Sequence, residues 1–173
     1  MIDYIHLIME DDTLLVSSIN GIPFQVLFSD IEPYWSYANK YDIDGCSVNV
    51  WDDKLLIRLS TAGGQGGAVI LWDAYSETIE HISDGSFCIA VDIDDQYIYK
   101  LLDVQTFTTD SNLQIWKVPL NCMDINYDET CLAKGIAPPQ YSSKKNCTLR
   151  KLKDAFEIKI NGQVAYIIAI DLT

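Results

Sequence analysis

The sequence is short of basic residues and of histidine, the side chain that most often acts in acid–base catalysis. Its 173 residues include 12 Lys and Arg against 25 Asp and Glu, for a formal charge of −13. Such an acidic chain repels phosphate groups, so we expect no direct binding to nucleic acid. The two histidines, His6 and His81, have no neighbouring metal ligand or nucleophile motif. We therefore expect no metal site, no cofactor and no enzymatic activity.

Targeting signals are absent as well. The first residues do not form a basic segment followed by a long apolar one, and no run of about 18 apolar residues occurs, so neither secretion nor membrane insertion is expected. The five cysteines have no metal or redox spacing, which fits reduced thiols in the cytoplasm. Cys46 and Cys88 each begin a short apolar run, and we interpret both as small core residues.

Two segments partly match known ligand-binding loops, one for phosphate and one for calcium, but each lacks residues that the site needs. The Gly-rich segment 61–67 precedes an apolar strand and no helix, so it is interpreted as a hairpin connection, not a phosphate loop. The acidic segment 124–129 begins like a calcium loop. It lacks the glycine of the sixth position, and Gly135 stands where the twelfth-position glutamate belongs. Calcium is therefore not expected.

Apolar and aromatic residues are plentiful and are arranged in short runs. The chain is 49% hydrophobic and 11% aromatic, with 10 Tyr and 4 Trp, a composition that favours an all-β fold. Asn20–Gly21 and Asn161–Gly162 are the strongest hairpin signals. The almost unbroken apolar run Val164–Ile170 is expected to be a central strand, buried on both faces.

One pattern recurs about every 42 residues: an apolar run, paired aspartates, a second apolar run, a loop and a third run. The aspartate pairs at 11–12, 52–53 and 94–95 lie 41 and 42 residues apart. A short helix is expected near Thr130–Lys134. We expect a single domain, 1–173, with repeat units at about 2–44, 45–82 and 83–120, an irregular excursion at 121–146 and a C-terminal hairpin at 147–173.

The third copy, Cys88–Tyr99 followed by Asn112–Trp116, resembles a β-propeller blade of the WD/YVTN type. Trp72–Asp73 matches the Trp-Asp pair of such blades, whereas Trp116–Lys117 departs from it. The resemblance covers about Ile2 to Leu120, and the chain is too short for six or seven blades of about 40–45 residues. The resemblance implies antiparallel meanders in a small or incomplete propeller. A β-sandwich satisfies the same pattern.

Blades of this kind would bring the turns between their first and second strands to one rim. This predicts an acidic face for a basic partner, with the alternative that aspartate is simply a favoured turn residue. The aromatic segment 29–44 offers apolar anchors, with the alternative of a loop folded over the core. The candidate partner-binding residues are Asp11, Asp12, Asp52, Asp53, Asp73, Glu77, Asp94, Asp95, Tyr34, Trp35 and Tyr37.

The negative charge is concentrated before residue 144. Residues 1–143 hold 22 acidic and 6 basic side chains, and residues 144–173 hold 3 acidic and 6 basic ones. A small acidic chain like this is similar to the immunity proteins of bacterial toxin systems, such as contact-dependent inhibition. The resemblance implies a cytoplasmic protein that neutralises a basic toxin domain, for example a nuclease, by occluding its active site. A propeller-like interaction adaptor and a β-propeller that binds a small molecule or sugar remain as alternatives.

Overall fold

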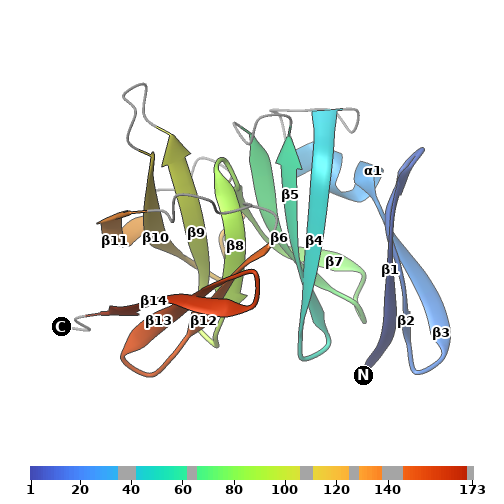
Figure 1. Cartoon of the computed structure of the whole chain (residues 1–173). Coiled ribbons are helices and arrows are strands. Elements are labelled where there is room, and N and C mark those ends of the chain that lie inside the picture. Colours follow the sequence, from blue (N-terminus) through green and yellow to red (C-terminus); the bar gives the residue numbers. More distant parts are fainter. Residues whose placement is uncertain (35–41, 62–65, 106–110, 125–128, 138–145, 171–173) are drawn as a thin grey trace. The chain divides into compact units, whose positions relative to one another are not determined.

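The computed structural model describes residues 1–34, 42–61, 66–105, 111–124, 129–137 and 146–170. These residues form four antiparallel sheets of consecutive strands, each with two edges, so the prediction of an all-β fold is confirmed (Figure 1). Closure into a propeller and the 42-residue repeat stay predictions. The chain divides into two compact units. Unit 1 comprises Met1–Gly85 with Asn121–Tyr127, and unit 2 comprises Ser86–Leu120 with Asp128–Thr173.

The first sheet of unit 1 contains β1 (Ile2–Glu10), β2 (Thr13–Ile19) and β3 (Ile22–Leu27), in that order. Asn20 and Gly21 join β2 to β3 with φ of 49° and 77°, which confirms the predicted hairpin turn. The chain then forms helix α1 (Phe28–Ile31) and the 3₁₀ turn η1 (Glu32–Tyr34). No helix in the described part of the chain has the length and apolar character needed to cross a bilayer.

The second sheet contains β4 (Ile43–Trp51), β5 (Lys54–Thr61), β6 (Gly67–Asp73) and β7 (Thr78–Asp84), again in chain order. A later segment of unit 1 continues this sheet beyond β7. The Ile82 amide donates to the Cys122 carbonyl oxygen at 2.9 Å, and Met123 forms a parallel bridge with Ile82. The edge of β7 is therefore covered by chain that lies about 40 residues further along the sequence.

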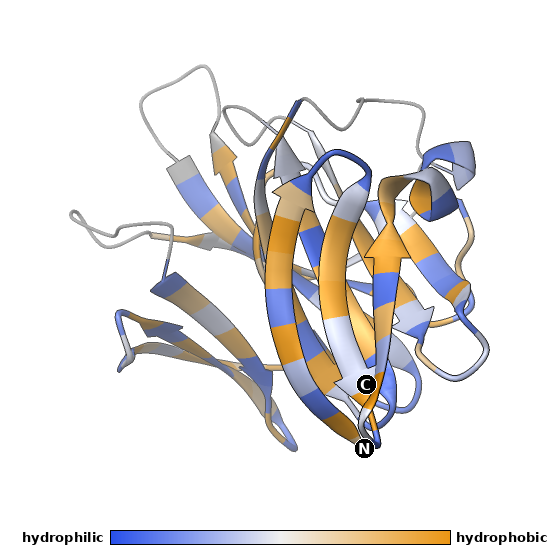
Figure 2. Cartoon of the chain, turned by 90° about the vertical axis from the view of Figure 1, so that its right-hand side faces the viewer, coloured by the Kyte–Doolittle hydropathy of each residue, from blue (hydrophilic) through white to orange (hydrophobic). Residues whose placement is uncertain are grey.

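A hydrophobic core joins the two sheets of unit 1. Leu15, Val26, Ile57 and Ile70 are fully buried in it. Trp72 is 2% exposed, and its ring stacks on Phe24 with centroids 5.1 Å apart. Figure 2 shows hydrophobic and hydrophilic residues alternating along strands, as expected when one face of a sheet is buried. Each such buried aliphatic side chain contributes about 1.5–3 kcal/mol, so this core is the main source of stability in unit 1.

Two glycines permit a close backbone approach between β6 and the residue after β7. The Gly85 amide donates to the Gly67 carbonyl oxygen at 3.1 Å. A Cβ atom on Gly85 would lie 2.6 Å from the Ala68 amide nitrogen, and one on Gly67 would lie 2.5 Å from the Leu59 carbonyl oxygen. These atoms belong to backbone, so a side chain at either position has no flexible neighbour to displace.

We predict that Gly85→Ala lowers the free energy of unfolding by about 1–3 kcal/mol, because the added methyl forces β6 and β7 apart. Gly21→Ala is the matched control. Its Cβ meets nothing within 4 Å, although φ is +77°, so its cost is about 1 kcal/mol from backbone strain alone. Urea unfolding monitored by tryptophan fluorescence measures both. Equal losses in the two variants would contradict the close approach.

The third sheet contains β8 (Cys88–Ile93), β9 (Tyr97–Gln105), β10 (Ser111–Pro119) and β11 (Thr130–Ile136). The expected helix at Thr130–Lys134 is wrong, because this segment is β11, paired with β10. Glu129, directly before β11, forms an ion pair with the fully buried Lys100 of β9 and so anchors the start of β11. Long-range pairing thus decides the conformation here over local helix propensity.

The fourth sheet contains β12 (Cys147–Lys151), β13 (Ala155–Ile160) and β14 (Gln163–Ala169). The Asn161–Gly162 turn is confirmed, with φ of 52° and 78°. The expectation of a doubly buried final strand is wrong. β13 occupies the centre, β14 is an edge, and Val164 and Ile167 are 53% and 56% exposed. Only the β14 face with Tyr166 and Ile168 packs against the core of unit 2.

Candidate functional site: two acidic ends of unit 1

Most of the net charge of the chain belongs to unit 1. Unit 1 contains 15 acidic and 3 basic side chains, a net charge of −12, whereas unit 2 contains 10 acidic and 9 basic ones, a net charge of −1. Two of the three basic residues of unit 1 lie in the described part of the chain. Lys54 forms ion pairs with Glu80 and Asp73, and Arg58 donates to Ser47 at 3.1 Å. The carboxylates of unit 1 are therefore the candidate contacts for a basic partner.

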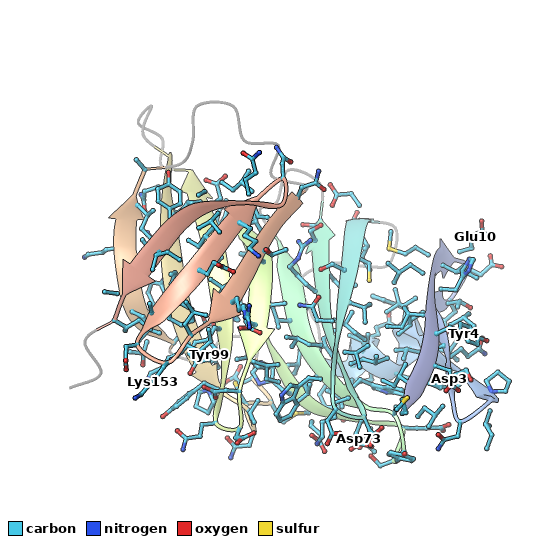
Figure 3. The ribbon with its side chains drawn as sticks, turned by 60° about the horizontal axis from the view of Figure 1, so that its bottom comes forward. Asp3, Tyr4, Glu10, Asp73, Tyr99 and Lys153 are labelled. Carbon is cyan, nitrogen blue, oxygen red and sulfur yellow. The ribbon has the colours of Figure 1, made fainter. Side chains whose placement is uncertain are left out.

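The aspartate turns of unit 1 do not share one rim, which corrects the predicted acidic face. The Met1 amine lies 3.0 Å from Asp53, so the turn at 52–53 is beside the start of β1. The turn at 11–12 follows Glu10, at the other end of this nine-residue strand. In Figure 3, Glu10 lies at one end of β1 and Asp3 towards the other.

The odd number of strands in the first sheet explains this arrangement. After three antiparallel strands the chain leaves the sheet at the end where β1 finishes, and β4 starts there and runs back (Figure 1). A fourth strand would have returned the chain to the end where β1 begins, and the two aspartate pairs would then have met. The turn after β6 lies beside the 52–53 turn, because the Ala74 amide donates to the Asp53 carbonyl oxygen at 3.3 Å.

One end of unit 1 gathers carboxylates from three separate segments. α1 packs beside the β1–β2 turn, since the Phe28 amide donates to the Asp12 carbonyl oxygen at 2.7 Å and the Ser29 hydroxyl donates to the Asp12 carboxylate at 2.7 Å. The start of β4 lies at the same end (Figure 1). All the carboxylates here are exposed except Asp12, which is partly so. We call this set the acidic end: Glu10, Asp11, Asp12, Asp30, Glu32, Asp42 and Asp44.

Exposed apolar side chains accompany the acidic end. Tyr34 of η1 is 46% exposed, and Met9 and Leu7 near the end of β1 are 44% and 45% exposed. Tyr34 is the one predicted anchor that can be placed, since Trp35 and Tyr37 lie outside the described residues. Carboxylates beside exposed aromatic and aliphatic groups are a suitable surface for a partner that carries both charge and apolar contacts.

At the opposite end of unit 1 the carboxylates mainly stabilise the fold. We call this set the capped end: Asp3, Asp52, Asp53, Asp73 and Glu77. The Asp3 carboxylate accepts hydrogen bonds from the Gly21 amide and the Ser18 hydroxyl, which lower its pKa. Asp73 accepts from the Ser76 and Tyr75 amides at 2.8 and 2.9 Å, and the Ser76 amide is the main cause of its lowered pKa.

The third aspartate pair belongs to unit 2 and its two members differ in role. Asp94 caps the β8–β9 turn: it accepts from the Gln96 and Tyr97 amides at 2.9 Å each and from the Tyr99 hydroxyl at 2.5 Å. Burial disfavours its charge, but these hydrogen bonds outweigh burial and the pKa of Asp94 is lowered. Asp95 is exposed at the tip of the same turn.

Asp92 has the opposite electrostatic balance. Burial raises its pKa, although its carboxylate accepts the Lys151 amide at 2.5 Å and so ties β12 to β8. The Tyr99 phenol nearby also has a raised pKa, first because of burial and then because it donates to Asp94. Carboxylates with displaced pKa values can mark catalytic sites. Here the donors that hold them are turn and strand amides and one phenol, an arrangement that stabilises unit 2.

The histidines and the cysteines Cys46 and Cys88 are the remaining side chains with potential chemical roles. His81 is buried and its Nε2 lies 2.7 Å from the Ser83 hydroxyl, while His6 is exposed on β1. Cys88 is buried, and burial raises the pKa of Cys46 to about 11, so both behave as the predicted small packed residues. The described residues contain no cluster of His, Cys, Asp or Glu suited to a metal ion.

Comparison of the chain with protein-family profiles, with curated protein sequences and with solved structures gives no match. The acidic end is the feature of unit 1 that bears on function. Five of its acidic residues, Glu10, Asp30, Glu32, Asp42 and Asp44, were not among the candidates from the sequence. The available signal was that Glu10 directly precedes the 11–12 pair and that the other four lie within the aromatic segment 29–44, but only the path of the chain brings those four to the 11–12 turn.

We predict that Asp94→Ala lowers the free energy of unfolding at pH 7 by about 1–2 kcal/mol, because two turn amides and a phenol lose their acceptor. Asp95→Ala, one residue along the same turn, is the control and changes stability by less than about 0.5 kcal/mol. Urea unfolding measures both. Because the pKa of Asp94 is lowered, the difference should be full above pH 3.8 and shrink as the pH falls below it. Equal effects of the two variants would contradict the capping role.

Asp92→Asn is predicted to do the reverse and raise the free energy of unfolding at pH 7. The amide oxygen can still accept from Lys151, while the buried charge is gone. A raised pKa means that the native protein loses stability as Asp92 ionises above pH 3.8, so the gain should shrink as the pH falls toward that value. Urea unfolding at several pH values tests this. A loss of stability at pH 7 would show that the carboxylate charge is needed.

Proposed function

We propose that this chain is an acidic immunity-type protein that binds a basic toxin domain in the cytoplasm and blocks its active site. The observation that carries the proposal is the gathering of seven carboxylates at the acidic end of a unit with net charge −12. A nuclease is one suitable class of toxin, because its nucleic-acid channel is basic and a carboxylate cluster presents charges of the same sign as phosphates.

The mechanism follows from the arrangement of charge and apolar groups. The field of unit 1 would attract a basic surface from a distance and raise the association rate. Contact would then bury Tyr34, Met9 and Leu7, and removal of this apolar area from water would slow dissociation. Occlusion needs no chemistry from the inhibitor. The five carboxylates of the capped end add to the same field.

The proposal predicts strongly salt-dependent binding to the product of the neighbouring gene. Between 50 and 300 mM NaCl we expect the association rate to fall at least about tenfold, because the Debye length drops well below the size of the surface. Stopped-flow or surface-plasmon measurements would give the rate. Absence of binding at 50 mM NaCl would remove the proposal for that partner.

A pair of charge-matched variants tests the location of the surface. Glu10→Gln/Glu32→Gln removes two exposed carboxylates from the acidic end, and Asp52→Asn/Glu77→Gln removes two exposed ones from the capped end. The first should slow association several-fold and flatten the salt dependence, and the second should do so much less. If both slow association equally, the whole field steers the partner and the acidic end is not its docking surface.

A further inference from the structure

β14 differs from every other edge strand among the described sheets. An open edge presents unpaired amides and carbonyls, and proteins usually protect it with a charge or a proline. Residues Gln163 to Ala169 contain neither, although one irregularity of register near Ala165 interrupts the pairing with β13. The other edges each carry such a residue: Asp3 in β1, Pro23 in β3, Asp44 in β4, Glu80 in β7, Asp92 in β8, Lys134 in β11 and Arg150 in β12.

The orientation of the free backbone groups follows from one hydrogen bond. The Ile170 amide donates to the Asp154 carbonyl oxygen at 3.1 Å, across the ladder to the β13 side. Amides alternate in direction along a strand, so those of Ile168 and Tyr166 also point to β13. Those of Ile167 and Ala169 point outward. The C-terminal half of β14 therefore presents two regularly spaced backbone amides at its open edge, beside exposed apolar side chains.

We propose that β14 pairs with β14 of a second copy of this chain, joining two three-stranded sheets into one six-stranded sheet. A strand that meets its own copy across a two-fold axis is antiparallel by symmetry, so its outward amides and carbonyls find partners. If the axis passes at Ile167, the two Ile167 side chains are opposite each other, and Ala165 faces Ala169 of the copy. Small residues on both sides then leave room for the branched pair.

Charge favours a second copy at this edge over a charged partner. Unit 2 has a net charge of −1, and the charged neighbours of β14 on β13 compensate each other, with Lys159 Nζ 3.5 Å from Glu157. The strand itself is uncharged and offers a basic or acidic partner nothing to pair with. This inference is separate from the proposed function and predicts the opposite salt effect, because salt screens the repulsion between two chains of charge −13.

Sedimentation velocity on the full chain, from 5 to 200 µM, tests the pairing. We expect a concentration-dependent species of twice 19.5 kDa whose population rises with NaCl. Ile167→Lys puts a charge on the strand, and Ala169→Pro removes an outward amide without touching the β13 ladder, so both should abolish the dimer. Ile22→Lys is the matched control, since Ile22 is a 71% exposed isoleucine on the β3 edge, and it should leave the dimer intact.

Hydrogen exchange gives an independent reading. In the dimer the amides of Ile167 and Ala169 should exchange as slowly as those of Ile168 and Tyr166, and in Ile167→Lys only the amides at 166 and 168 should stay protected. Circular dichroism checks that the variants fold. A monomer at every concentration overturns the proposal. So does a dimer that survives Ile167→Lys and Ala169→Pro in folded form, or one that Ile22→Lys abolishes equally.

Discussion

Tight antiparallel turns are the constraint on which this structure depends. Every described sheet is built from strands that follow one another in the chain, and most of the reversals between them take only a few residues. The connection from β10 to β11 is longer, because the chain passes through Asn121–Tyr127 of unit 1 on its way. Asp11, Asn20, Asp52 and Asn161 all adopt positive φ at the short reversals, a conformation that Asn and Asp tolerate better than most residues. The abundance of acidic turns thus has a structural cause first. Asp73 and Asp94 add a second one, because each accepts two amides of its own turn.

The charge of the surface is a consequence of the same turns and of where the chain leaves each sheet. The three-stranded first sheet delivers the chain to the end that already holds the 11–12 turn. The connection to β4 adds Asp30, Glu32 and Asp42 there, and the start of β4 adds Asp44. Carboxylates at the other end are mostly used as caps or ion-pair partners. Three carboxylates of the acidic end also accept hydrogen bonds: Asp12 from the Ser29 hydroxyl, Asp30 from the Leu27 amide and Asp44 from the Ser60 hydroxyl. The two ends therefore differ mainly in the number of their carboxylates, seven against five, and the end with more of them is the proposed docking surface.

Local features of the sequence predicted the local structure well. The turns at Asn20–Gly21 and Asn161–Gly162 depend on two residues each, and both formed as expected. Predictions that needed long-range information were wrong. Thr130–Lys134 is a strand because β10 has an open edge for it, and Val164–Ile170 is apolar without being central because β13 takes the middle place. The single acidic face was wrong because nothing local tells whether the first sheet has three strands or four. Trp35 and Tyr37 lie outside the described residues.

The segment that covers β7 has a consequence for how the chain folds as it is made. Ile82 takes its carbonyl partner from Cys122, so unit 1 lacks its last strand-like contact until residues near 123 have left the ribosome. At about 5–20 residues per second, the 38 residues after Gly85 take roughly 2–8 s to synthesise. During that time β7 is an open edge of a nascent domain whose other parts can already pack. Its Glu80 and Asp84 then keep the edge from pairing with neighbouring nascent chains.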